Sequence, residues 1–585
     1  MVLPFLNPPN SKARKSQMQD KFLGLWQREN ADPGQFVFMY GLASDEYPYL
    51  APRKLNRYIR PISQPQALLG GEALSWVEDH ELYYDGEHIC HVTTDQPQLV
   101  RMGAYLIVWP DGTIYNTHTK ELSSMNAAYS SNGTTLSVRP CMLSGQEYQY
   151  TASDTAPADP AAMSYWFDTQ TNAMYQYLDG EWQGIDTVYS RIEGPALGAD
   201  FKDYDVVKLT GFDYDEYNLD AATVYARGED YIVIATGTVR DYDQEGEISI
   251  TRQAPEMDFI CENGNRLWGC SSEKHEIYGS KLGDPTNWNS YLGISTDSYA
   301  ATVGSEGNYT GCIAYMGYVH FWKEDRCHRL YGTRPENYQL IELPIRGVKE
   351  GCHKSLCVVN GILYYVNRHG VMAFDGSSPV SVGDALGDVT LDDAIAGAHG
   401  DKMLLYAKVT GDKHMDNGDQ IDWEYAMDTS RGLWHSVGNV ITVGYANTAE
   451  GTFRLDWGGL WLIGGAGWET KYDIPGTSYD EEEIRWAAET GDHGEDSPNQ
   501  KFLKRLTLRV KMERGAKLMV DIEYDSDGNW QRALTYESQS KKSVTLMMRA
   551  KRCDHFRLRY YGTGKVMILS MCKTYEEGSE RVGKA

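Results

Sequence analysis

Apolar strands separated by tight, glycine-containing turns recur along this chain, and this pattern restricts it to folds built from antiparallel β-sheets. At residues 105–115, for example, two apolar runs flank Pro110-Asp111-Gly112, and Asp-Gly between alternating apolar residues is a strong hairpin signal. Comparable strands recur along the chain at intervals of about 40 to 50 residues, which is the spacing of β-propeller blades. The sequence therefore predicts an all-β fold around a β-propeller with six to eight blades. Comparable strands centre near Leu267, Val319, Leu363, Leu404 and Phe453.

Residues 258–298 indicate how each blade is built. A short strand is cut by the turn Asn263-Gly264-Asn265, and a second crossing ends at Gly283-Asp284-Pro285, as in consecutive antiparallel strands. Trp288 follows and can cover the small core between the strands, because each propeller blade carries a large aromatic side chain. The chain has 41 Tyr against 13 Phe, which favours half-buried strand faces where the hydroxyl group stays in water.

The regular spacing of the strands is interrupted at two places, which divide the chain into domains. Between about Glu147 and Ser249 the regular spacing is lost, which indicates a small β-domain inserted into a loop of the propeller. After Ser497, five segments alternate apolar and polar residues with period two, which predicts an antiparallel sandwich. The N-terminal arm either becomes ordered against a partner or stays a flexible tail. The expected organisation is an N-terminal arm (1–34), propeller (35–146 and 256–496), inserted β-domain (147–255), C-terminal β-sandwich (497–575) and tail (576–585).

The charge of the chain is large, negative and unevenly spread. Its net charge of -27 argues against general affinity for nucleic acid, because phosphate binding needs a basic footprint. Residues 501–573 nevertheless carry 17 basic and 7 acidic side chains. Residues 200–258 carry 15 acidic and 5 basic side chains, so the insert is the most acidic part. Two surfaces of opposite sign suit head-to-tail association with copies or partners, although solvated strands explain the basic segment equally well.

These charges supply the candidate sites. The basic strands offer a partner-docking surface, and the acidic turn of the insert is expected to be an exposed tip that is either solvated or a weak cation site. The candidate docking residues are Lys504, Arg505, Arg509, Lys511, Arg557 and Arg559. The candidate acidic tip consists of Asp241, Asp243, Glu245 and Glu247.

No pattern in the sequence predicts catalysis. Phosphate-loop and nucleophile-elbow motifs are absent, and Ser271 with Lys274 matches S-x-x-K only in a turn between strands, where that pair cannot open a helix as it does in the enzymes that use it. The ten Cys form no C-x-x-C pair, which indicates buried thiols rather than a zinc site. We therefore expect no catalytic residue, no metal and no cofactor. No run of 18 apolar residues occurs, so we expect no membrane segment.

Five stretches of the chain form long, ordered motifs: 46–53 (EYPYLAPR), 265–270 (NRLWGC), 283–288 (GDPTNW), 295–299 (STDSY) and 552–557 (RCDHFR). They resemble a family of virion structural proteins from tailed bacteriophages and prophages of gut Clostridia-like bacteria. The resemblance covers about residues 35 to 575, and more distantly the propeller is similar to the tail-hub, nozzle and DNA-stabilisation proteins of short-tailed phages. It implies a homo-hexameric ring in the virion tail, below the portal and adaptor, made in the host cytoplasm and with packaged DNA passing nearby.

Two functions from different classes follow. The first is a non-enzymatic tail hub or nozzle component that contacts the portal, the adaptor and tail fibres, with an acidic lumen that lets DNA slide past. The second is a glycan-recognising protein of the tail tip, in which the insert reads a host sugar. Exposed aromatic rings can stack on sugars, but packing inside the insert explains the same residues. These aromatic residues are Trp182, Tyr214, Tyr217 and Tyr242.

Overall fold

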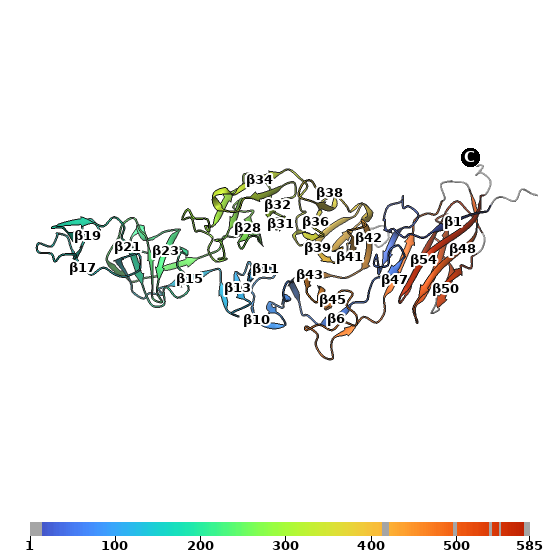
Figure 1. Ribbon diagram of the computed structural model, residues 1–585, viewed down its shortest axis with the longest axis horizontal. Coiled ribbons are helices and arrows are strands. Elements are labelled where there is room, and N and C mark those ends of the chain that lie inside the picture. The colour runs from blue at the N-terminus through green and yellow to red at the C-terminus, as the bar shows by residue number, and fades with distance from the viewer. Residues whose placement is uncertain (1–13, 412–419, 495–499, 538–540, 549–550, 578–585) are drawn as a thin grey trace, which may run out of the picture. The chain divides into compact units, whose positions relative to one another are not determined.

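The computed structural model describes residues 14–411, 420–494, 500–537, 541–548 and 551–577. It is almost entirely β-structure (Figure 1), which confirms the all-β prediction. Residues 1–13 of the expected arm and 578–585 of the expected tail lie outside the described residues. In the part that is described, no helix has the length and apolar character needed to cross a membrane. The helical segments are the short 3₁₀ turns η1 (Asp215–Tyr217), η2 (Pro335–Asn337), η3 (His353–Ser355) and η4 (Asp384–Leu386).

The chain forms two compact units, and each contains four-stranded antiparallel sheets whose strands follow one another in sequence. Unit 1 comprises residues 1–96, 322–327 and 344–585, and unit 2 comprises 97–321 and 328–343. The first two such sheets of unit 2 are β11 (Gln98–Met102), β12 (Tyr105–Trp109), β13 (Thr113–Asn116) and β14 (Leu122–Ser124), then β27 (Phe259–Glu262), β28 (Leu267–Ser271), β29 (Glu276–Gly279) and β30 (Tyr299–Thr302). A further four-stranded sheet, with its central turn assigned to unit 1, is β31 (Gly311–Tyr315), β32 (Tyr318–Trp322), β33 (Cys327–Tyr331) and β34 (Gln339–Leu343).

Unit 1 contains three more four-stranded sheets of this kind. They are β7 (Pro65–Leu69), β8 (Ser75–Glu78), β9 (Glu81–Tyr84) and β10 (Glu87–His91); β35 (Cys357–Val359), β36 (Ile362–Asn367), β37 (Gly370–Phe374) and β38 (Val380–Ser381); and β39 (Thr390–His399), β40 (Lys402–Thr410), β41 (Ile421–Asp428) and β42 (Leu433–Gly438). Large aromatic side chains fill the spaces beside these strands, and Trp76 and Trp434 are almost fully buried. Sheets of this form are typical of propeller blades. The number of blades stays a prediction.

The last sheet of this series takes a strand from the N-terminal part of the chain. Its order is β43 (Thr442–Thr448), β44 (Gly451–Asp456), β45 (Gly459–Leu462), β6 (Arg57–Arg60) and β46 (Tyr479–Asp480). Strand β6 pairs antiparallel with β45, and Tyr58 lies opposite Trp461. Without β6, this edge of β45 would be open to pairing with another chain. It is covered instead by a segment that precedes it by about 400 residues.

The insert of unit 2 is built on an eight-stranded sheet with the order β15-β26-β22-β23-β24-β21-β16-β25. Its core includes Val138, Ile192, Leu209 and Ile250, none of which is exposed. The strands are β15 (Ala127–Ser130), β16 (Leu136–Cys141), β21 (Tyr189–Glu193), β22 (Val206–Thr210), β23 (Ala222–Arg227), β24 (Tyr231–Ile234), β25 (Tyr242–Gln244) and β26 (Ser249–Arg252). A smaller sheet beyond it contains β17 (Tyr150–Ser153), β18 (Tyr165–Asp168), β19 (Ala173–Leu178) and β20 (Glu181–Gly184).

The C-terminal part of unit 1 contains two further sheets, which we call sheet A and sheet B. Sheet A has the order β1 (Arg14–Gln19), β54 (Val566–Glu577), β48 (Lys501–Met512) and β51 (Lys541–Thr545), and β52 (Arg552–Cys553) also pairs with β48. Sheet B has the order β2 (Gly24–Leu25), β3 (Gln35–Tyr40), β47 (Arg485–Thr490), β53 (Phe556–Thr563), β49 (Lys517–Tyr524) and β50 (Gln531–Glu537). The short strands β4 (Leu42–Ala43) and β5 (Ala51–Pro52) pair with each other.

Sheets A and B pack face to face around a buried core. The hydroxyl group of Tyr560 on sheet B contacts the sulfur of Met571 on sheet A at 3.1 Å, and Leu508 and Val520 have no exposed surface. Strand β1, which belongs to the expected N-terminal arm, pairs along its whole length with β54. This part of the arm is therefore ordered against its own chain, because β54 offers it a complete row of main-chain donors and acceptors.

Candidate functional site

The stretch 258–298, which carries part of the family resemblance, is held together by one buried arginine. The Arg266 side chain is 2% exposed, and its guanidinium donates to the main-chain carbonyls of Ser280 at 2.7 Å, Asp297 at 2.5 Å and Ser295 at 3.0 Å. Burial lowers the pKa of Arg266. Because five guanidinium hydrogens can satisfy several carbonyls at once, this single side chain ties the turn after β29 to the segment before β30.

The carboxylate of Asp297 completes this framework. It accepts main-chain hydrogen bonds from Gly293 at 2.6 Å and Ile294 at 3.0 Å, and a side-chain bond from Ser290 at 3.1 Å. Trp288 is 2% exposed and donates its ring nitrogen hydrogen to the carbonyl of Pro285. The polar groups of this stretch are therefore used to hold the backbone, as expected for an architectural segment.

Four cations form a basic face on the outside of sheet A. Along β48 the residues Leu506, Leu508 and Val510 point into the core, so the alternate positions point outward. Strand β51 continues the surface, because Lys541 lies directly opposite Lys511 in the antiparallel register. We define the basic face as Arg505, Arg509, Lys511 and Lys541, all of which are exposed.

The cations of the basic face have no acidic partners in the part of the chain that the structure describes. Among the residues that the structure describes, Arg509, Lys511 and Lys541 form no ion pair, and Arg505 donates only to the hydroxyl group of Thr545 at 3.1 Å. The neighbouring Lys504 is different, since it lies 3.4 Å from the carboxylate of Glu576. A hydrogen bond from Arg14, with Lys504 close by, lowers the pKa of Glu576.

The two remaining candidate docking residues lie in sheet B and are neutralised there. Arg557 contacts Glu489 at 3.2 Å and also pairs with Glu523, and Arg559 contacts Glu489 at 2.8 Å. The Arg559 guanidinium also lies 4.1 Å from the centre of the Trp530 ring, a distance at which cation–π attraction operates. The structure thus brings together Arg505, Arg509 and Lys511 but separates them from Arg557 and Arg559.

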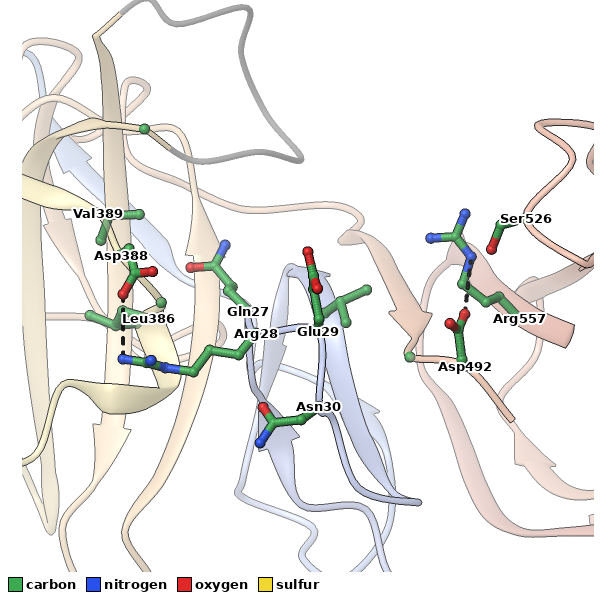
Figure 2. A pocket seen from close by; sticks show the side chains of 14 residues that line it. Gln27, Arg28, Glu29, Asn30, Leu386, Asp388, Val389, Asp492, Ser526 and Arg557 are labelled. Atoms are coloured by element: carbon green, nitrogen blue, oxygen red, sulfur yellow. Dashed lines mark ion pairs between the residues drawn. The ribbon is translucent and has the colours of Figure 1, made fainter. Parts of the chain in front are cut away.

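A cavity of about 700 Å³ lies beside Arg557 within unit 1 (Figure 2). On one side Arg28 is 3.6 Å from Asp388, and on the other Arg557 is 3.8 Å from Asp492. Glu29 and Asn30 lie between these two pairs in Figure 2. Both arginines of the cavity therefore face carboxylates, and this balance of charge does not indicate a particular ligand.

The predicted acidic tip extends from Asp241, just before β25, through Asp243 on that strand to Glu245 and Glu247 after it. Strand β25 pairs with β16, and Arg139 of β16 contacts Asp241 at 3.3 Å and Asp243 at 2.5 Å. The hydroxyl group of Tyr150 donates to Asp241 at 2.7 Å, and burial together with this carboxylate raises the pKa of Tyr150. Glu245 accepts a long bond of 3.4 Å from Thr135.

Three important residues were missed by the sequence reasoning. Lys541 was overlooked because its position beside Lys511 depends on which strand pairs with β48. Asp213 and Asp215 were overlooked because the loop that carries them returns to β25 only in the folded insert, where the main-chain nitrogen of Asp213 donates to the Gln244 side chain at 2.9 Å. The sequence signal for Asp213 and Asp215 is a turn rich in Asp and Tyr, and the structure shows that both side chains are exposed.

No metal centre is found in the described part of the chain, where no group of three or more His, Cys, Asp or Glu side chains is placed to hold an ion. Seven of the ten cysteines are buried and none is in a disulfide. Burial raises the pKa of Cys141 to about 12 and that of Cys553 to about 11, so both thiols stay protonated near neutral pH.

Comparison with known proteins gives no family assignment. No family model matches the sequence, and no curated protein matches it.

Among solved structures, the chain is similar to an endosialidase of phage phi92, with 10% identity, a TM-score of 0.26, and coverage of 87% of this chain and 80% of that one. It is also similar to an exo-β-1,3-galactanase of Phanerochaete chrysosporium, with 9% identity and a TM-score of 0.20 over 53% of this chain and 94% of that one. A third similarity is to the extracellular domain of a hybrid two-component system from B. thetaiotaomicron, with 9% identity and a TM-score of 0.16 over 92% of this chain and 98% of that one. Similarities with such low TM-scores carry no functional argument.

Proposed function

We propose that this chain is a non-enzymatic structural component of a bacteriophage virion, a tail hub or nozzle subunit that assembles as a ring below the portal and adaptor. The observation that carries the proposal is the hydrogen bonding within residues 265–299, a segment that contains three of the stretches (265–270, 283–288 and 295–299) that resemble virion proteins. The polar side chains of this segment, above all Arg266 and Asp297, form hydrogen bonds that fix the backbone. A structural subunit needs such a rigid frame, because its surfaces must keep one shape through assembly.

The charge distribution supports the same proposal. The basic face of sheet A stands out on a chain with a net charge of -27, and opposite charges on one molecule favour association between copies in a defined orientation. Surfaces of net negative charge elsewhere would repel packaged DNA as it passes.

The mass of the full-length protein in solution tests the proposal. We expect a closed ring of about six to twelve copies, formed alone or on addition of the neighbouring adaptor or portal protein. Native mass spectrometry or light scattering after size exclusion measures this directly. A monomer that binds neither protein would contradict the hub or nozzle proposal.

A second candidate is a glycan-recognising protein of the tail tip. Half-buried aromatic residues on β19 and β20 favour it, since Tyr175 stacks on the buried ring of Trp166 at 4.9 Å and Trp182 lies 5.2 Å from Tyr177. Aromatic surfaces with one accessible side suit sugar rings. Two of the other aromatic residues serve the insert itself, because Tyr217 is fully buried and Tyr242 packs against Tyr214 at 4.8 Å. A glycan array on which the protein binds nothing would dispose of this candidate.

A further inference from the structure

We propose that the basic face of one copy docks on the acidic end of the insert of a second copy, an inference that rests on the proposed ring function and names its contact surfaces. We define the acidic end as Asp213, Asp215, Asp243, Glu245 and Glu247.

The arrangement of cations on the basic face favours binding of an anionic partner. Lys511 and Lys541 lie directly opposite each other on neighbouring strands, and like charges at such positions destabilise a sheet. Arg509 is two residues from Lys511 on the same side of β48, so three cations that form no ion pair with any described residue lie within one small area. A carboxylate surface brought against them would remove this repulsion.

The open part of this surface lies on two strands. Ala51 packs on Met567 and Leu569 at one end of β54, which leaves β48 and β51 open. These two strands have 12 and 5 residues, so at ~3.3 Å per residue and ~4.8 Å per strand their outer sides cover on the order of 300 Å². A specific interface buries about 800 Å² on each partner, so the basic face forms the centre of such a contact and not the whole of it.

The acidic end offers the complementary charge. Its five carboxylates are exposed, and Arg139 pairs with Asp243 alone among them. The loop and the strand are fixed together by the Gln244 side chain, which accepts from Asp213 and donates to the carbonyl of Gly211 at 2.8 Å. Tyr214 and Tyr242 pack edge to face beside these acids, and the Arg240 guanidinium lies 3.9 Å from the centre of the Tyr214 ring.

A second copy fits these observations better than nucleic acid does. The same chain supplies both surfaces, and the chain as a whole carries a net charge of -27, which repels phosphate. Contact between two different surfaces is heterologous, so repeating it generates a ring if the rotation closes. Nucleic acid at the basic face is the alternative that the experiment must separate.

Sedimentation velocity of full-length variants tests the proposal at about 0.15 M salt, where charges more than ~8 Å apart are screened. Arg509→Glu with Lys511→Glu reverses the basic face, and Glu245→Lys with Glu247→Lys reverses part of the acidic end. Lys120→Glu with Lys274→Glu makes the same change in net charge as the first pair at two turns of unit 2. Circular dichroism and thermal melts confirm that each variant is folded.

We expect each reversal alone to weaken self-association by at least about tenfold, while the control pair associates like the wild type. An equimolar mixture of the two reversed proteins should assemble again, because each then presents a surface complementary to the other. A chain that carries both reversals should also recover association.

Unchanged assembly of the basic-face variant would overturn this inference while leaving the ring function intact. A wild-type protein that remains monomeric and ignores the adaptor and portal would overturn both. If the basic-face variant loses binding of a fluorescent DNA duplex but assembles normally, nucleic acid is the partner and the inference is wrong.

Discussion

Arg53 and Glu481 form a two-pronged ion pair that joins positions 428 residues apart, with nitrogen–oxygen distances of 2.8 and 2.6 Å. Glu481 also accepts from the main-chain nitrogen of Asn56 at 2.9 Å. Burial alone would raise the pKa of Glu481, but the hydrogen bonds from Arg53 outweigh it and lower that pKa. The pair therefore fixes the N-terminal segment that leads into β6 at the place where β6 completes the last sheet of unit 1.

Replacement of Arg53 by Met should lower the free energy of unfolding of unit 1 by about 1.5–3 kcal/mol, because the hydrogen bonds that it removes involve charged groups. Since the pKa of Glu481 is lowered by folding, its contribution is present above the pKa of about 4.3 of an unfolded Glu and is lost as the pH falls below it. Urea unfolding followed by tryptophan fluorescence measures both effects. Lys517→Met, which breaks an exposed pair with Glu537, should cost about 0–1 kcal/mol; an equal cost for the two would contradict the prediction.

Arg252→Met should destabilise the insert by about 3–5 kcal/mol, because it leaves Asp205 buried without its ionic partner. The side chains of Arg252 and Asp205 are 5% and 1% exposed. The double variant Arg252→Met with Asp205→Leu should regain part of this loss, since no unpaired charge is then buried. Thermal melts compare these variants with Lys208→Met, whose partner Asp220 is exposed. A double variant less stable than Arg252→Met would refute the explanation.

His493 should make unit 1 less stable in mild acid. Burial, and then the charge of nearby Lys573, lowers the pKa of this imidazole to about 3, and its Nε2 atom has no hydrogen-bond partner among the described residues. The unfolded imidazole has a pKa of about 6.5, so this contribution to stability is complete above pH ~6.5 and falls by up to ~1.4 kcal/mol per pH unit below it.

The variant His493→Gln should therefore show a flatter dependence of unfolding free energy on pH between about 6 and 4. Urea titrations at several pH values measure the slope. A smaller slope remains in this variant, because burial also lowers the pKa of His435 to about 4. His369→Gln, a change at an exposed turn residue, should leave the slope unaltered. If both variants keep the slope of the wild type, His493 is not its source.

Lys541→Glu should have opposite effects on the single chain and on its assembly. It replaces the repulsion with Lys511 by a cross-strand attraction, so the free energy of unfolding should rise by about 0.5 kcal/mol. It also removes a cation from the basic face, so self-association should weaken. Lys542→Glu is the matched control, because Lys542 lies opposite Val510. Stronger assembly of Lys541→Glu would count against the docking surface, and unchanged stability would count against the cross-strand repulsion.

Local features of this fold follow from the sequence with little help from tertiary contacts. Gly112 has φ of +77° in the turn between β12 and β13, a conformation that glycine adopts without steric cost. The alternation along β48 placed Leu508 in the core and Arg509 outside, because successive side chains of a strand point to opposite faces. The all-β class and the outward orientation of the basic residues could therefore be predicted.

The partners of these strands could not be predicted in the same way. Arg509 and Arg559 lie on similar period-two strands, yet Arg509 is unpaired in sheet A while the register of sheet B places Arg559 opposite Glu489. Strand β1 pairs with β54 more than 550 residues away. Main-chain hydrogen bonds are the same for every residue that can donate and accept, so long-range pairing is decided by the packing of whole sheet faces. The sequence by itself determined strands, turns and the sign of each segment's charge, whereas tertiary structure alone decided which charges are neutralised and which remain open to a partner.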